Sequence, residues 1–349
     1  MATFEYNTKT SASILVKCMF VYFTIFFLTS AAVQGRTFEL TLHPAKVAEP
    51  QQKYQLLPIA DKQIDADAVS LYEKAIQSIP KDVKIKQIQE WLKLPAEQLP
   101  QQQAEAAVQK CMESLRLVAR AARCRECKWP EWEPGATLPD SSGYRNLQYI
   151  IRLWARLELA RGGYDGALLA MQTGFGMAVH LGQAPVSMQV QVSIAIGEVM
   201  CREVDQFIQC KESPNLYRAL ANLPRPLVSM EKAIAKDLEN LKDHNFLVRR
   251  QTKKILDPAH ERMRMIERRA NTRLNALQSL EAIRHYAATH NGQLPETLSD
   301  ITQIEMPMDL LGDKPFEYRR TATGAVLQSA IPEGGNERDA IQYEIVLKK

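Results

Sequence analysis

Apolar residues recur every three to four positions over most of the chain from Asp67 to His290, a spacing typical of amphipathic α-helices. The first such face follows Asp67, and its members are Ala68, Leu71, Tyr72, Ala75, Ile76 and Ile79. Prolines then separate a short helical segment from a predicted long helix over residues 104–124. Glycine is sparse, with 15 residues in 349, which also favours helices. The pattern therefore predicts a mainly α fold.

A helical hairpin is predicted at the centre of this body, from helices over residues 147–159 and 164–181. The glycine-rich turn between them, at Gly162, resembles the turn of a tetratricopeptide repeat, with Tyr164 and Ala167 at matching positions. A second copy does not follow at the 34-residue period of that repeat. The sequence thus indicates a repeat-like helical hairpin rather than an array.

The N-terminal segment combines basic residues with an uncharged apolar run from Cys18 to Val33. Lys17 precedes the run and small residues end it, which is the order of a secretory signal peptide with cleavage after Ala32 or Gly35. Two alternatives stay open: an uncleaved membrane anchor over residues 14–33, and a buried helix of a cytosolic fold. We therefore expect an exported protein, periplasmic or extracellular, or one anchored in the cytoplasmic membrane by a single N-terminal span.

Changes in composition along the chain predict that it is divided into four regions. They are a signal peptide or anchor over residues 1–35, an irregular linker over 36–66, a helical domain over 67–248, and a basic helix plus an α+β module over 249–349.

The basic stretch from Arg249 to Arg273 is the strongest local charge feature, with nine lysines or arginines against three acids. Such a helix can bind nucleic acid, anionic lipid or an acidic polymer, or can present a solvated face. The second interpretation is favoured by an inward apolar stripe that includes Met263 and Leu274. The formal net charge of the whole chain is only +4, and we do not expect a nucleic-acid partner.

Five cysteines follow the apolar segment, and Cys124 and Cys127 form a C-x-x-C pair. The pair is a candidate disulfide or a structural pair, and redox or metal chemistry is the alternative. Zinc would require a second pair of ligands, and Lys128 stands where a haem-attachment motif has histidine.

The C-terminal hundred residues predict a small α+β module. A helix continues to His290 and ends at Asn291-Gly292, a favourable C-terminal cap. Three period-two segments then predict antiparallel strands, at 316–319, 325–329 and 341–347. The expected fold is therefore a helical-hairpin body with a small C-terminal module of a long helix and about three strands.

This module resembles the C-terminal part of type II secretion major pseudopilins over about 75 residues. The shared positions are Tyr286, Asn291, Gly292, Leu294, Pro295, Leu298, Asp309, Gly312, Pro315, Tyr318 and Ser329. Segments of the body, including residues 215–227, are similar to exported bacterial helical proteins of unknown function. Over 200 residues separate the N-terminal apolar run from the module, and no prepilin peptidase site is recognised, which departs from the pseudopilin pattern.

The pseudopilin resemblance implies a calcium-binding loop after the second strand. The corresponding residues offer oxygen ligands at Glu333, Asn336, Glu337 and Asp339, which suits calcium. The loop is short for six to eight ligands, so a polar turn is the alternative. No other cofactor is expected.

Function is predicted only broadly. We expect a non-enzymatic interaction or scaffold protein with a protein partner. One alternative is an accessory factor of a secretion or pilus-like system. Another is an extracytoplasmic hydrolase that uses His180, His285 or His290 as a base, although no partner motif accompanies them. His260-Glu261 is not a metalloprotease motif, because Arg264 stands where the second histidine is required.

Overall fold

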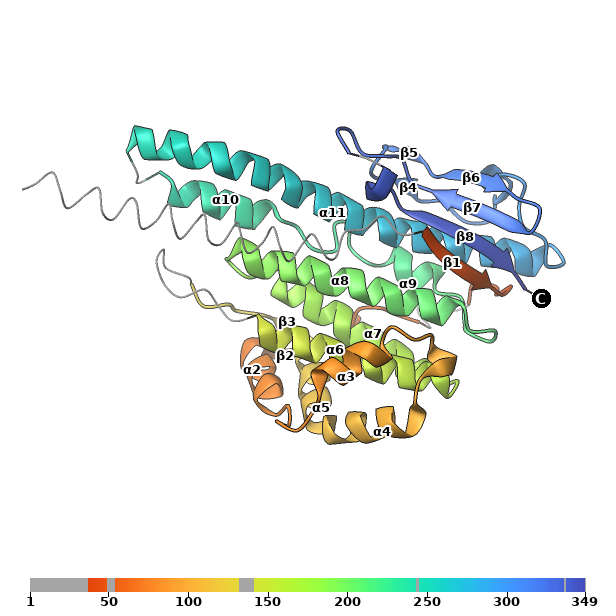
Figure 1. Ribbon diagram of the computed structural model, residues 1–349, viewed down its shortest axis with the longest axis horizontal. Coiled ribbons are helices and arrows are strands. Elements are labelled where there is room, and N and C mark those ends of the chain that lie inside the picture. Colours follow the sequence, from red (N-terminus) through yellow and green to blue (C-terminus); the bar gives the residue numbers. More distant parts are fainter. Residues whose placement is uncertain (1–36, 49–53, 132–140, 243–244, 336, 349) are drawn as a thin grey trace, which may run out of the picture.

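A computed structural model describes residues 37–48, 54–131, 141–242, 245–335 and 337–348, and these ranges contain ten α-helices and a small sheet region (Figure 1). The helices are α2 (Val69–Gln77), α3 (Ile85–Trp91), α4 (Gln101–Lys110), α5 (Met112–Ala121), α6 (Ser142–Ala160), α7 (Tyr164–Leu181), α8 (Ser187–Ile208), α9 (Tyr217–Ala221), α10 (Glu231–Asn240) and α11 (Phe246–Thr289). The mainly α fold with a small α+β part is confirmed.

The centre of the body is the hairpin of α6 and α7, extended by α8. All three helices bury most of their length, with Leu147, Phe175 and Phe207 fully inaccessible. Gly162 closes the hairpin turn with φ of 70°, a left-handed conformation that glycine adopts without steric cost. The predicted helical hairpin is therefore present, because its signals are local to the turn and to each helix.

The short helices α2 to α5 cover one side of this hairpin, and here the structure differs from the prediction. The single helix expected over residues 104–124 is two helices that meet at Cys111, whose φ and ψ are −90° and 8°. The second helix ends at Ala121, and the last residue of the predicted range, Cys124, begins strand β3 (Cys124–Glu126), which pairs in parallel with β2 (Ile64–Asp67). Both helices direct their apolar faces into one core. The apolar stripe in the sequence is therefore continuous and gives no sign of the break between the helices at Cys111.

The C-terminal module packs on the last part of α11. It contains a short β4–β5 pair, Met308–Asp309 with Lys314–Pro315, and an antiparallel run of β6 (Glu317–Arg320), β7 (Gly324–Gln328) and β8 (Gln342–Leu347). These last three are the predicted strands. Asn291 and Gly292, with φ of 54° and 73°, end α11 as expected, and Gly292 N–H donates to the Ala287 carbonyl at 2.8 Å.

A fourth strand completes this sheet from the other end of the chain. Residues Thr37–Leu42, within the expected irregular linker, form β1 and pair in parallel with β8, giving the order β1-β8-β7-β6. Leu40 and Leu42 point into the core, opposite Ile345 and Leu347 of β8. The sequence did not predict this pairing because the partner strand lies about 300 positions away.

Helix α11 belongs to both the helical body and the module. Its first half packs with α8 and α10 around a small apolar cluster that includes Val190, Ile234 and Met263. Its second half lies under the sheet, with Leu277 and Ile283 fully buried. The paired ends of α10 and α11 form an arm at the opposite end of the molecule from the sheet (Figure 1).

Candidate functional site

The C-x-x-C pair lies at β3, inside the apolar packing of α2 and α7. Cys124 and Cys127 are buried and carry free thiols. Burial raises the pKa of the Cys124 thiol and raises that of Cys127 to about 12. Reactive cysteines require the opposite shift, since the thiolate is the nucleophile and the metal ligand. This environment favours a structural role for the pair over redox or metal chemistry.

We expect Cys127 to resist alkylation in the native protein. A pKa near 12 leaves the thiolate fraction at pH 8 roughly a thousandfold below that of an ordinary thiol with pKa near 9. Mass spectrometry after iodoacetamide treatment should find Cys127 unmodified when native and modified in guanidinium chloride. Cys210 is partly exposed, and burial raises its pKa only to about 11, so it should react about tenfold faster than Cys127 and serves as the internal comparison. Rapid native modification of Cys127 would contradict this burial.

The three histidines proposed as hydrolytic bases do not come together. Burial lowers the pKa of His180 on α7, and its Nδ1 lies 2.8 Å from the Tyr72 hydroxyl. His285 accepts a hydrogen bond from Val47 N–H at 3.0 Å, on a different helix. The His290 ring stacks on Tyr286 with centroids 3.8 Å apart. Each imidazole thus has a packing partner, which accounts for it structurally.

The proposed calcium ligands stay a prediction. Asn336 lies outside the described residues, Glu333 is exposed, and Asp339 is partly buried. Within the described residues, no group of three or more histidine, cysteine, aspartate or glutamate side chains is placed to hold a metal ion. The Asp339 carbonyl accepts a hydrogen bond from Arg269 Nε at 3.2 Å, which fixes this loop to α11.

Asp309, one of the positions shared with pseudopilins, is fully buried and holds the β4 turn. Its carboxylate accepts hydrogen bonds from the N–H groups of Leu311 at 2.8 Å and Ala330 at 2.6 Å. Both bonds stay within the module, so they account for this residue by local structure.

Sequence reasoning missed three clusters of buried charge. In the first, the fully buried Glu203 of α8 accepts hydrogen bonds from Arg152 at 2.7 Å and Arg156 at 2.5 Å, both on α6. Arg156 also donates to the Leu94 carbonyl at 2.5 Å. Burial alone would raise the pKa of Glu203, but the two guanidinium groups outweigh burial and the pKa is lowered. Arginines four positions apart on a largely apolar helix were the available signal.

A second cluster joins α8, α11 and the sheet. Arg273 of α11 contacts Asp205 at 2.5 Å and Glu198 at 3.0 Å, both on α8. The Tyr343 hydroxyl of β8 donates to the other Asp205 oxygen at 3.2 Å. The Arg273 guanidinium also lies 4.4 Å from the ring centroid of Phe38 on β1.

The third cluster fastens the N-terminal strand to α11. Arg284 is fully buried and pairs with Glu281 through two bonds of 3.0 Å. It also donates to the carbonyl of His43, just after β1, and to the carbonyl and hydroxyl of Ser213. One side chain therefore connects three chain segments that are far apart in sequence.

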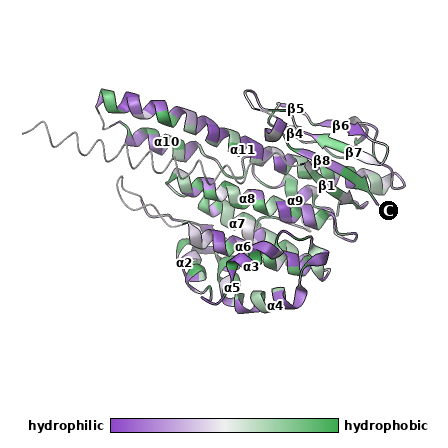
Figure 2. Cartoon of the chain, in the orientation of Figure 1, coloured by the Kyte–Doolittle hydropathy of each residue, from purple (hydrophilic) through white to green (hydrophobic). Residues whose placement is uncertain are grey.

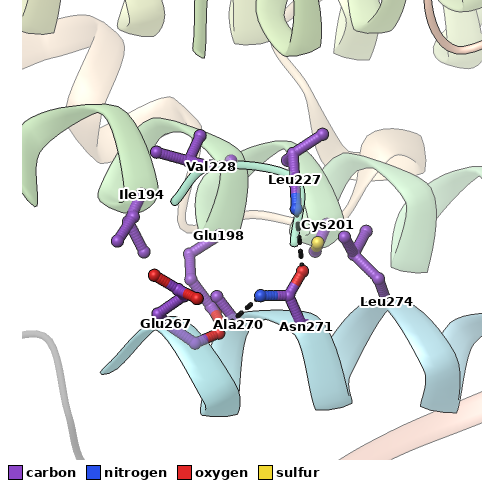
Figure 3. Close-up of a pocket in the computed structure, with 10 residues that line it drawn as sticks. Ile194, Glu198, Cys201, Leu227, Val228, Glu267, Ala270, Asn271 and Leu274 are labelled. Carbon is purple, nitrogen blue, oxygen red and sulfur yellow. Dashed lines mark hydrogen bonds between the residues drawn. The ribbon is translucent and has the colours of Figure 1, made fainter. Parts of the chain in front are cut away.

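Two hollows of the described residues differ in size and shape: one is very small and the other is open to solvent. The pocket in Figure 3 lies between α8, α11 and the Leu227-Val228 segment, and its volume of about 10 Å³ corresponds to about one water. Asn271 closes it by accepting from Leu227 N–H at 2.9 Å. A second hollow, of about 320 Å³, is an open depression beside His43 and Lys211. The first of these is too small for an organic substrate.

The basic stretch divides into two halves with different environments. In the second half the cations are engaged: Arg264 pairs with Glu231 at 2.9 Å, and Arg268 with Asp313 at 3.0 Å. In the first half, four cations are exposed at the free end of the arm: Arg249, Arg250, Lys253 and Lys254. The interpretation of the basic stretch as an ordinary helical face therefore suits the second half, whose cations are paired within the chain, better than the first half.

Comparison with known proteins shows no matching family model, curated protein or solved structure. Among the described residues no helix is both long and apolar enough to cross a membrane. The predicted signal peptide or anchor, residues 1–35, lies outside the described residues.

Proposed function

We propose that this chain is a non-enzymatic interaction or scaffold protein that works outside the cytoplasm, either exported or held by its N-terminal segment. The three buried charge clusters are the observation that carries this proposal. Ion pairs connect α6 to α8 and α8 to α11, and the same charged groups contact the sheet through the Tyr343 hydroxyl and the Phe38 ring. The ionisable groups of these clusters therefore support the framework. Such a framework keeps the surface geometry constant for a partner.

The module offers the surface that we expect a protein partner to contact. Three large apolar side chains of this end are exposed: Met308 (43%), Ile331 (46%) and Val346 (43%). Exposed apolar side chains contribute more to binding than the charged residues around them, because their burial on association removes apolar area from water.

Site-specific photo-crosslinking in cells tests the proposal. A photoreactive phenylalanine analogue at position 308, 331 or 346 should give a discrete adduct with a different protein. The same group at Lys86, an exposed polar position of α3 at a distance from the sheet, should not. Adducts only with a second copy of the chain would contradict the proposal and favour a self-assembling secretion factor. Turnover of a hydrolase substrate by the purified protein, lost on His180→Gln, would favour an enzyme.

Intact mass in the membrane and soluble fractions tests the localisation. Loss of residues 1–32 or 1–35 with a soluble product is expected for a cleaved signal peptide. A full-length mass in the membrane fraction is expected for a single-span anchor. A full-length product in the cytosolic fraction would contradict both.

A further inference from the structure

The free end of α11 carries the two most exposed large apolar side chains of the described residues, Phe246 (73%) and Leu247 (68%). The four exposed cations Arg249, Arg250, Lys253 and Lys254 follow within two turns. We call residues 246–254 the arm tip. In Figure 2 the free end of α11 shows hydrophobic colour directly beside hydrophilic colour.

The arm tip is ordered by its own cap. The Asn245 side chain accepts a hydrogen bond from Val248 N–H at 3.0 Å, which closes the first turn. Phe246 and Leu247 are therefore held as the first two helical residues. Further along, Leu256, His260 and Met263 face inward. Arg249 and Lys253 lie seven positions before Leu256 and His260, on the same side of the helix, but they are exposed because they belong to its free end; Arg250 and Lys254 point away from that side.

The charges of the arm tip are not explained by the stability of the helix. The macrodipole is positive at the helix N-terminus, so it does not stabilise Arg249 and Arg250, which directly follow a first turn that contains no acid. No carboxylate of a described residue lies within ion-pair distance of the four cations, whereas Arg264 and Arg273 are paired further along α11. An anionic partner outside the chain would compensate this excess of positive charge.

We propose that the arm tip docks on an anionic lipid bilayer. Phe246 and Leu247 enter the boundary between headgroups and acyl chains, and the four cations contact lipid phosphates. Large apolar side chains beside a lysine- and arginine-rich helical face are the combination that binds bilayer interfaces. A nucleic acid would use the cations but would leave the apolar pair in water. This surface is additional to the partner surface of the module and lies at the opposite end of the molecule.

The test uses the full chain in vesicles, with an environment-sensitive fluorescent amino acid at position 247 and brominated lipids as quencher. Vesicles with 30% phosphatidylglycerol should quench the probe, and phosphatidylcholine vesicles should not. At about 1 kcal/mol per cation, R249Q/R250Q should weaken docking roughly 25-fold. F246Q should weaken docking as well, because it removes apolar area that enters the bilayer.

The matched control is K84Q/K86Q, which removes two exposed cations from the region of α3 and changes the net charge equally. It should leave quenching unchanged, and circular dichroism should show that all variants keep their helix content. Quenching that is absent in both lipids would overturn the proposal and assign the arm tip to another partner. Equal quenching in both lipids, or an equal loss in the control variant, would overturn recognition of the anionic surface.

Discussion

Replacing Glu203 with leucine is expected to lower the free energy of unfolding by about 3–5 kcal/mol. The substitution leaves the guanidinium groups of Arg152 and Arg156 buried without their anion, at 7% and 4% side-chain exposure. Desolvated, unpaired charge is among the most costly defects in a protein interior. Chemical denaturation followed by circular dichroism measures the effect.

Two further variants separate the charge effect from a general loss of packing. R152M/R156M/E203L removes all three charges together and should recover most of the lost stability, short of the bond to the Leu94 carbonyl. Glu90→Gln breaks the exposed pair with Lys93 and should change stability by less than about 1 kcal/mol. Equal destabilisation by E203L and by the triple variant would show that packing, and not unpaired charge, dominates this site.

The same cluster gives a pH dependence with a defined sign. The pKa of Glu203 is lowered in the folded protein, so its contribution to stability is present above its unfolded pKa of about 4.3 and is lost as pH falls below that value. The free energy of unfolding of the wild type, compared with that of R152M/R156M/E203L, should therefore decrease as the pH falls below about 4. A pH-independent difference would contradict the lowered pKa.

Replacing Arg284 with methionine is the second large effect, with an expected loss of about 3–5 kcal/mol. The substitution leaves Glu281 buried without a cation and removes donors from the carbonyls of His43 and Ser213. Because His43 directly follows β1, hydrogen exchange of residues 37–42 should accelerate more than that of α6. Denaturation and amide exchange measured by mass spectrometry check both expectations.

Two control variants test whether the charge or the hydrogen-bond geometry of Arg284 stabilises the protein. Arg284→Lys keeps the charge, but a single ammonium group cannot reproduce a planar fork that reaches three chain segments, so an intermediate loss is expected. R284M/E281L should recover part of the stability, because no buried anion then remains. If R284M left the exchange of β1 unchanged, the pairing with β8 alone would be holding that strand in place.

Local patterns correctly indicated most of the helices and the three antiparallel strands. The hairpin turn at Gly162 and the cap at Asn291-Gly292 were identified because both conformations depend on a few adjacent residues. The bend at Cys111 was missed because both halves keep one inward stripe. Periodicity reports which face is buried, and it does not report whether the axis changes direction.

The candidate sites depended more on distant contacts. The C-x-x-C pair was visible in the sequence, but the raised pKa of Cys127, from which we expect low reactivity, follows from burial of its thiol in the folded protein. Glu203 lies 51 and 47 positions from Arg152 and Arg156, so nothing in a local window pairs them. The division of the basic stretch likewise depends on which arginines meet a carboxylate from another element, as Arg264 meets Glu231.

The sequence by itself determined the helical class, the hairpin, the antiparallel run of strands and the strongly basic character of residues 249–273, because hydrophobic period, turn residues and charge are properties of neighbouring positions. Only the tertiary structure decided that β1 completes the C-terminal sheet, that buried arginines join the helices, and that the arm tip keeps its cations and apolar pair exposed. These features depend on segments far apart in sequence, and burial and charge pairing at such positions are set only when the whole chain has packed.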